Sequence, residues 1–217
     1  RKVALLGHGG TGKSSLAEAM LFTSGAISRL GRVDDGSSAS DYDPDETERN
    51  MSINASVLPC EWKGVKINLV DTPGYADFIG DVIGSLSAVE AALLVVDASG
   101  AIEVGTDTGW DLAEAAGITR LFFVNKLEKE NMDFSRMLEA LREKFGTSVA
   151  PLQIPIGKED TFTGVVDLLT HKAYTWQSGK ISQIDIPADM QESISRMREA
   201  LIESVAEMDD ALMEKYF

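Results

Sequence analysis

The sequence predicts an α/β fold, with a mostly parallel sheet covered by helices on both faces. Two continuous apolar runs, Ala91 to Val96 and Leu121 to Val124, have the composition of strands buried on both faces. Between them, Asp107 to Ala116 has the pattern of a helix that ends at Gly117. A third apolar run, Lys2 to Leu6, precedes a glycine-rich turn. Strands and helices that alternate in this way place a ligand beyond the carboxyl ends of the strands.

The remaining elements of the first half follow from local patterns. Lys13 to Thr23 has apolar residues at helical spacing. Ile53 to Trp62 and Val65 to Val70 are predicted to form a strand pair that turns at Lys63-Gly64. Residues from Ile27 to Asn50 are polar and have no clear period. A loop of that length inside a compact domain is unusual unless it is functional.

The pattern changes after about Pro155. Before that point, Asp133 to Phe145 is predicted to be an amphipathic helix. Beyond it, Gly164 to Leu169 and Lys172 to Trp176 indicate a small antiparallel pair, and a long helical stretch runs from Pro187 to the end. The apolar residues of that stretch recur every three or four positions, which favours packing against a core: Met190, Ile194, Met197, Leu201, Val205, Met208 and Leu212.

Composition excludes several classes of protein. The chain has 217 residues, 44% of them hydrophobic, so it can bury a full core. No apolar run is long enough for a membrane span, and no signal-peptide pattern is present, so we expect no membrane partner. The single cysteine, Cys60, is typical of a reducing compartment, and we expect a cytoplasmic location. The net charge of -15 argues against broad, charge-driven binding to nucleic acid.

The turn after the first strand fits the phosphate-loop pattern G-x-x-x-x-G-K-[ST] from Gly7 to Ser14. In this pattern, backbone N–H groups and a helix N-terminus surround the phosphates of a nucleoside triphosphate, Lys13 reaches the β- and γ-phosphates, and the Ser14 hydroxyl binds magnesium. The alternative is a glycine-rich turn without a ligand. The residues of this stretch expected to contact the nucleotide are His8, Gly9, Gly10, Thr11, Gly12, Lys13, Ser14 and Ser15.

Two further segments follow strand-like runs. Asp71-Thr72-Pro73-Gly74 fits D-x-x-G, in which Asp71 holds magnesium through a water and the Gly74 N–H meets the γ-phosphate. Ser52, at the end of the long polar loop, is the candidate for the remaining magnesium contact, although an exposed loop serine is the simpler interpretation. The predicted metal ligands are therefore Ser14, Ser52 and Asp71.

The third segment is Asn125-Lys126-Leu127-Glu128. GTP-binding proteins carry N-K-x-D here, where the aspartate accepts two hydrogen bonds from guanine N1 and N2. Glu128 keeps the carboxylate but is one methylene longer, so its geometry must shift. We predict a preference for guanine, with Asn125, Lys126 and Glu128 holding the base and GTP or GDP with Mg²⁺ as the ligand.

Taken together, the chain resembles elongation factor G and its elongation-factor-G-like relatives, the translocation-type translational GTPases. Beyond the three nucleotide segments, the likeness extends through both halves of the chain. The further matching segments are Arg49 to Ile53, Tyr75 to Phe78, Leu152 to Gly157, Gly164 to Leu168, Ile186 to Asp189 and Leu212 to Tyr216.

The resemblance implies a P-loop GTPase domain over residues 1–156 and part of the family's small α+β insert over residues 157–217. The family's final S-A-x guanine motif has no usable counterpart, since Ser38-Ala39 and Ser87-Ala88 lie elsewhere. We therefore expect a piece of a longer protein that lacks the last sheet strand and its helix. Its partners would be guanine nucleotide and, through the full-length parent, the ribosome.

Four residues depart from the family pattern: Tyr75 for histidine, Gly10 for aspartate, Ser52 for threonine and Glu128 for aspartate. They place the chain among the elongation-factor-G-like paralogues. A phenol with a pKa near 10 is a poor base, though its hydroxyl can orient a water. With Lys13, Gly74 and Tyr75 as the catalytic residues, we expect very slow intrinsic GTP hydrolysis.

Three alternatives stay open at this stage. The chain could be a non-catalytic module whose nucleotide is structural or regulatory, a possibility that Tyr75 favours. It could be an ATP-using enzyme of the phosphate-loop class, which only Glu128 suggests. It could also keep the class and act as a release-factor or ribosome-protection relative.

Overall fold

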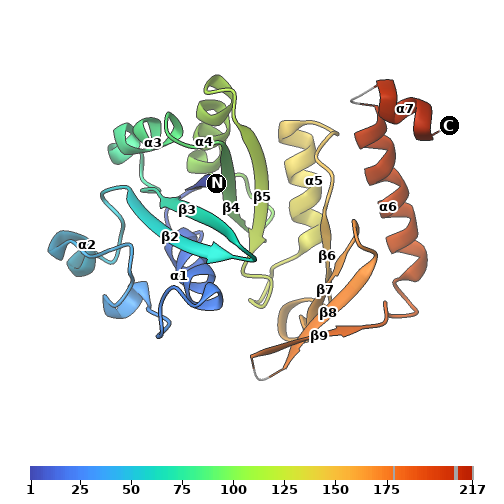
Figure 1. Cartoon of the computed structure of the whole chain (residues 1–217), viewed down its shortest axis with the longest axis horizontal. Coiled ribbons are helices and arrows are strands. Elements are labelled where there is room, and N and C mark those ends of the chain that lie inside the picture. The colour runs from blue at the N-terminus through green and yellow to red at the C-terminus, as the bar shows by residue number, and fades with distance from the viewer. Residues whose placement is uncertain (178, 208–209, 217) are drawn as a thin grey trace. The chain divides into compact units, whose positions relative to one another are not determined.

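The computed structural model describes residues 1–177, 179–207 and 210–216 (Figure 1). The chain folds into two compact units: Arg1–Asp97 with Ile102–Asn125, and Ala98–Ala101 with Lys126–Phe217. The expected GTPase domain, residues 1–156, thus includes the first unit and the beginning of the second. Among the described residues, no helix combines the length and the apolarity that crossing a membrane would need.

The first unit contains a five-stranded sheet in the order β2-β3-β1-β4-β5. β1 pairs in parallel with β3 and β4, β4 pairs in parallel with β5, and only β2 is antiparallel to its neighbour. The predicted mostly parallel sheet is confirmed. The strands are β1 Lys2–Leu6, β2 Ser56–Trp62, β3 Val65–Asp71, β4 Ala91–Asp97 and β5 Thr119–Asn125.

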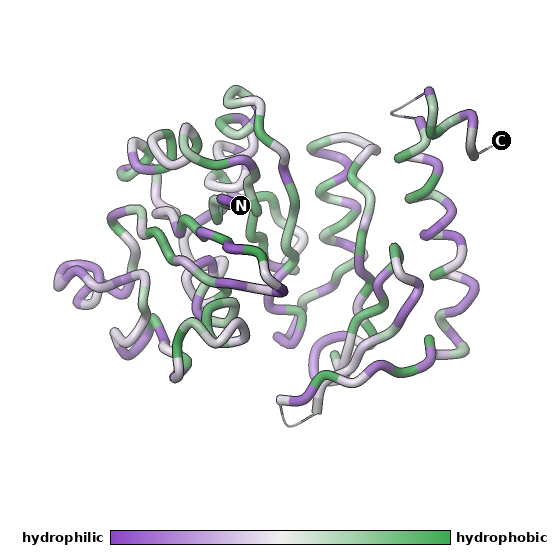
Figure 2. Tube along the Cα trace, viewed as in Figure 1, coloured by the Kyte–Doolittle hydropathy of each residue, from purple (hydrophilic) through white to green (hydrophobic). Residues whose placement is uncertain are grey.

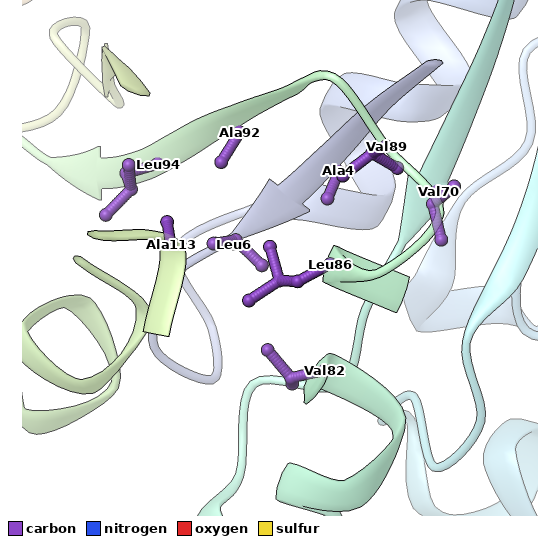
Figure 3. Close-up of a cluster of buried hydrophobic side chains, with 9 residues drawn as sticks. All are labelled: Ala4, Leu6, Val70, Val82, Leu86, Val89, Ala92, Leu94 and Ala113. Carbon is purple, nitrogen blue, oxygen red and sulfur yellow. The ribbon is translucent and has the colours of Figure 1, made fainter. Parts of the chain in front are cut away.

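Helices cover both faces of this sheet, as predicted. On one face, Ala17 and Leu21 of α1 pack with Leu5, Leu58 and Leu69. On the other face, α3 and α4 contribute to a cluster of nine buried side chains, which includes Ala4 and Leu6 of β1 (Figure 3). Successive β1 residues therefore face opposite layers, as strand geometry requires. The helices are α1 Lys13–Ser24, α2 Pro44–Arg49, α3 Ile79–Leu86 and α4 Val104–Ala115, with 3-10 turns at Val33–Asp35 and Ala76–Phe78.

The long polar segment is more ordered than its composition indicates. It contains the six-residue helix α2, which the sequence patterns above did not predict. Asp43 caps α2 by accepting from the Asp45 N–H at 2.9 Å, and the Glu46 side chain accepts in return from the Asp43 N–H at 3.2 Å. This capping box and Pro44 at the first helical position are the sequence signals for the helix.

The second unit contains a four-stranded antiparallel sheet in the order β6-β7-β8-β9. The predicted pair corresponds to its two central strands. Its buried core includes Ile154, Val166 and Leu168 from the sheet side and Ile194 and Leu201 from α6, with Phe134 of α5 packed against them. The elements are α5 Phe134–Phe145, β6 Gln153–Ile156, a 3-10 turn at Glu159–Thr161, β7 Gly164–Asp167, β8 Lys172–Gln177, β9 Lys180–Ile184, α6 Gln191–Ala206 and α7 Asp210–Tyr216.

The predicted long carboxyl-terminal helix is described as two helices, α6 and α7. Hydrophobic and hydrophilic residues alternate along α6 (Figure 2), and its buried side chains are Ile194, Leu201 and Ala206. Ile194 and Leu201 belong to the predicted stripe, and Met190 and Met197 of that stripe pack against the same core while partly buried. Val205 and Leu212, expected to share that packing, are 48% and 42% exposed. Met208 lies outside the described residues.

Candidate functional site

A tight loop joins β1 to α1 and places backbone N–H groups at the start of a helix. Gly7, Gly10 and Gly12 have φ values of 134°, 82° and 96°, in the region that favours glycine. A Cβ atom at Gly7 would lie 2.3 Å from the Val95 carbonyl oxygen. The first turn of α1 has no side-chain cap and no acidic residue. Its N–H groups and its positive dipole end are thus suited to bind an anion.

Lys13, the first residue of α1, is 6% exposed and turns back onto the loop. Its ammonium group donates to the Gly7 carbonyl oxygen at 2.9 Å and to the His8 carbonyl oxygen at 3.0 Å. Burial lowers the pKa of Lys13 to about 8, although the nearby Asp71 carboxylate favours the charged form. A phosphate group here would meet a cation that has lost most of its water.

Asp71 ends β3 and is 1% exposed. Both of its carboxylate oxygens are buried without a hydrogen-bond partner among the described residues. Burial raises the pKa of Asp71 to about 6, while the nearby Lys13 ammonium acts in the opposite direction. A buried carboxylate that lacks partners is costly, so it favours a cation or water at this position.

Two hydroxyl groups predicted to bind magnesium lie together here. The Ser14 and Ser52 oxygens are 3.2 Å apart, and the Ser52 hydroxyl donates to Asp41 at 2.7 Å. Because the one Ser52 proton goes to Asp41, Ser14 is the donor to Ser52. Oxygen ligands of this kind suit Mg²⁺, which keeps several waters and binds few protein groups. The residues therefore fit magnesium, although the described residues contain no cluster of three or more His, Cys, Asp or Glu side chains that could hold a metal.

Asp41 was not among the residues predicted from the sequence. It is buried, its second carboxylate oxygen has no partner among the described residues, and burial raises its pKa, opposed by the hydrogen bond from Ser52. Asp41 lies in the polar loop outside any periodic element, so only its position in a suspected functional loop could have drawn attention to it.

The segment after β3 lies directly on the phosphate loop. A Cβ atom at Gly74 would lie 2.5 Å from Lys13 Nζ and 2.6 Å from the Gly9 nitrogen. The ring of Tyr75 lies against Gly9, and Tyr75 is 43% exposed overall. Gly74 thus lies next to Lys13, and Tyr75 lies next to Gly9 of the same loop.

These groups surround a pocket of about 220 Å³. Its wall combines predicted site residues from the phosphate loop, the polar loop and the segment after β3. The lining residues are Gly9, Gly10, Gly12, Lys13, Ser14, Ser15, Val33, Asp34, Asp41, Asn50, Met51, Ser52, Gly74 and Tyr75. Val33, Asp34, Asn50 and Met51 were not predicted.

Two predicted nucleotide contacts have side chains outside this wall. The imidazole of His8 accepts from the Gly105 N–H at 3.4 Å through Nδ1, and its Nε2 lies 3.9 Å from Glu103. Thr11 is fully buried, and its hydroxyl donates to the His8 carbonyl oxygen at 3.0 Å. Both side chains shape the loop, so any nucleotide contact from these residues would come from the backbone.

The residues predicted to hold the base lie at the end of β5 and directly after it. Asn125 donates from Nδ2 to the Thr11 carbonyl oxygen at 2.9 Å and thereby fixes the phosphate loop. Lys126 and Glu128 belong to the second unit, where Lys126 has a φ of 63° and Glu128 is exposed.

Comparison with known proteins gives concordant matches. A sequence model of the family described as elongation factor Tu GTP binding domain matches residues 1–211. The whole chain is 38% identical to elongation factor G 2 of Saccharophagus degradans and 36% identical to elongation factor G of Granulibacter bethesdensis, and it covers 32% of each protein. A crystal structure of a Thermus thermophilus protein superposes with a TM-score of 0.95 at 36% identity, over 100% of this chain and 32% of the other. The chain thus spans about a third of the length of these relatives.

Proposed function

Since the chain belongs to the elongation factor Tu GTP binding domain family, we propose that it is the GTP-binding and GTP-hydrolysing switch domain of an elongation-factor-G-like translation factor. The family supports guanine-nucleotide binding and GTPase activity. It does not favour the alternative of a purely structural ligand.

The observation that carries this proposal is the buried carboxylate of Asp71. Its two oxygens, unpartnered among the described residues, lie near Lys13 and near the hydroxyl pair of Ser14 and Ser52. Mg²⁺ held by Ser14 and Ser52, and by Asp71 through water, would neutralise charge on the β- and γ-phosphates. Lys13 and the first N–H groups of α1 would bind the same phosphates.

The remaining roles follow from the family resemblance. Asn125, Lys126 and Glu128 would hold the guanine base. The segments 27–52 and 71–78 would order around the γ-phosphate and relax after hydrolysis. The hydroxyl of Tyr75 would orient the attacking water beside Gly74, but a phenol is a weak base at neutral pH, so intrinsic turnover would be very slow.

The wider setting is proposed by the same analogy. Residues 1–156 would form the GTPase domain and residues 157–217 part of the insert. A longer parent protein, acting in the cytoplasm, would bring this domain to the ribosome. The strong negative charge makes broad nucleic-acid binding by this chain unfavourable.

Calorimetric titration of the purified chain with GTP, GDP and ATP, each with and without Mg²⁺, tests the proposal. We expect guanine nucleotides to bind at least about tenfold more tightly than ATP, and Mg²⁺ to strengthen GTP binding. Asp71→Asn should abolish the magnesium effect, whereas the exposed Asp111→Asn on α4 should preserve it. Equal affinity for GTP and ATP, or no magnesium effect in the unmodified chain, would contradict the proposal.

A further inference from the structure

Glu18 is a buried carboxylate that the nucleotide site, as described above, does not use. It lies in α1, one turn beyond Ser14, and is 2% exposed. Within the described residues it forms no ion pair with a lysine, arginine or histidine. A charged side chain is rarely buried without a charged partner, so its hydrogen bonds must compensate for the lost water.

Both carboxylate oxygens of Glu18 accept from backbone groups of the long polar loop. Oε2 accepts from the Gly31 N–H at 2.9 Å, and Oε1 accepts from the Ala39 N–H. Hydrogen bonds to an ionised acceptor are about twice as strong as those between neutral groups. One side chain of α1 therefore holds the loop at two separate points along its length.

The approach at Gly31 depends on its missing side chain. A Cβ atom there would lie 2.8 Å from Glu18 Oε2 and 2.3 Å from the Ser37 carbonyl oxygen. The loop backbone can therefore reach the carboxylate only because this position is glycine.

The second contact leads toward the nucleotide pocket. Ala39 lies two residues before Asp41, whose carboxylate accepts the hydrogen bond from Ser52. The intervening Ser40 is fixed as well, because its carbonyl oxygen accepts from the Ser56 hydroxyl at 2.7 Å. Glu18 and Ser56 thus hold two successive residues, Ala39 and Ser40, and together they fix the backbone that carries Asp41 and, through it, Ser52.

Ser14 and Glu18 are four positions apart and so lie on the same face of α1. Ser14 contacts the end of the loop through Ser52, and Glu18 contacts its beginning and middle. We propose that Glu18 is a positioning residue, which holds the loop on α1 so that Ser52 is placed for magnesium before nucleotide binds. This inference rests on the proposed function, because it assigns a cause to the placement of a proposed magnesium ligand.

Glu18→Gln tests the inference with little change of shape. The amide keeps one acceptor but turns an NH₂ donor toward a backbone N–H donor, so one hydrogen bond is lost and two donors face each other. Glu48→Gln, on the exposed side of α2, makes the same change of charge in the same loop and serves as the control.

Two measurements are required on each variant, after a melting curve has shown that it folds. The first compares GTP affinity in Mg²⁺ with GDP affinity in a chelator. We expect Glu18→Gln to weaken magnesium-dependent GTP binding about tenfold relative to the unmodified chain. Its affinity for GDP without magnesium should stay within about twofold of the unmodified value. The second measures trypsin cleavage at the exposed Arg29 and at Arg32 of the nucleotide-free chain, which should become several-fold faster.

If Glu18→Gln has the same magnesium-dependent GTP affinity and the same trypsin cleavage rate as the unmodified chain, the inference is overturned. An equal loss of GTP and GDP binding would also overturn it, because it would mean that Glu18 acts on the fold as a whole. If the unmodified chain shows no magnesium-dependent GTP binding, the proposed function fails, and unchanged cleavage in Glu18→Gln would then separately exclude attachment of the loop by Glu18.

Discussion

The ring of Tyr75 occupies the space that a side chain at Gly9 would fill. A Cβ atom at Gly9 would lie 2.6 Å from Tyr75 Cζ and 2.8 Å from Cε2. Gly9 belongs to the phosphate loop and Tyr75 to the segment after β3, so the absence of one side chain determines where the other can lie. The sequence marks Tyr75 as a departure from the family pattern and Gly9 as a nucleotide contact, but only the structure shows that the two residues depend on each other.

We therefore predict that Gly9→Ala reduces GTP hydrolysis about tenfold by displacing Tyr75. The fold should tolerate the change, because Gly9 does not have a positive φ and the partly exposed Tyr75 side chain has room to rotate away. Single-turnover hydrolysis by Gly9→Ala, Tyr75→Ala and the double variant forms a double-mutant cycle. The double variant should be no slower than Tyr75→Ala. Additive losses would show that Gly9 and Tyr75 act independently.

Asp71 makes the stability of the nucleotide-free chain depend on pH. Its pKa in the folded chain is about 6, above the ordinary value of 3.8, so the folded state binds more protons between these two values. Stability should therefore fall as pH rises from about 4 to about 6 and then stay level with respect to this group. Lys13, with its pKa lowered from 10.5 to about 8, contributes a rise in stability with pH between those values.

Asp71→Asn should remove the Asp71 contribution to this acidic profile and stabilise the nucleotide-free chain at pH 7 by about 3 kcal/mol, because the buried charge is gone. Urea denaturation between pH 4 and pH 8 measures both effects, with Asp111→Asn as the control. Destabilisation at pH 7, or an unchanged acidic slope, would show that the Asp71 carboxylate is well compensated in the free chain.

The helices and strands whose ends carry clear local signals, such as glycines or capping residues, are the ones whose bounds the sequence predicts well. β1 has its predicted bounds, and α1 extends the prediction by one residue, because glycines mark the loop between them. α5 lies between the cap residue Asp133, whose carboxylate accepts from the Arg136 N–H at 3.0 Å, and Gly146. Such local signals do not depend on distant contacts.

Other elements had no such signal. β9 is exposed along its whole length, so it lacks the alternation that identifies a strand. β6 has only four residues and contains Pro155. In the site, Asp41 contacts Ser52, 11 residues away in sequence, and Glu18 contacts Gly31, 13 residues away. Hydrophobic periodicity does not predict contacts of this kind.

Ser52→Ala should weaken GTP binding in Mg²⁺ about tenfold and affect magnesium-free GDP binding far less. It removes a proposed metal ligand, the acceptor for Ser14 and the hydrogen bond to Asp41. Ser52→Thr keeps the hydroxyl and should retain affinity within about threefold. Calorimetry with each nucleotide distinguishes these results, and Ser28→Ala in the same loop is the control. Wild-type magnesium dependence in Ser52→Ala would exclude Ser52 as a ligand.

Glu128→Asp should raise the preference for GTP over ATP about tenfold, because the shorter carboxylate matches the family pattern for binding guanine N1 and N2. Competition between labelled GTP and unlabelled ATP measures this ratio directly, and Glu130→Asp, exposed two residues further on, provides the matched control. Asn125→Ala should instead weaken the binding of both GTP and ATP, because the Asn125 amide donates to the Thr11 carbonyl oxygen of the phosphate loop. A loss of GTP affinity in Glu128→Asp would mean that the site is built for the longer side chain. Other residues of this protein would then compensate for glutamate in place of the family's aspartate.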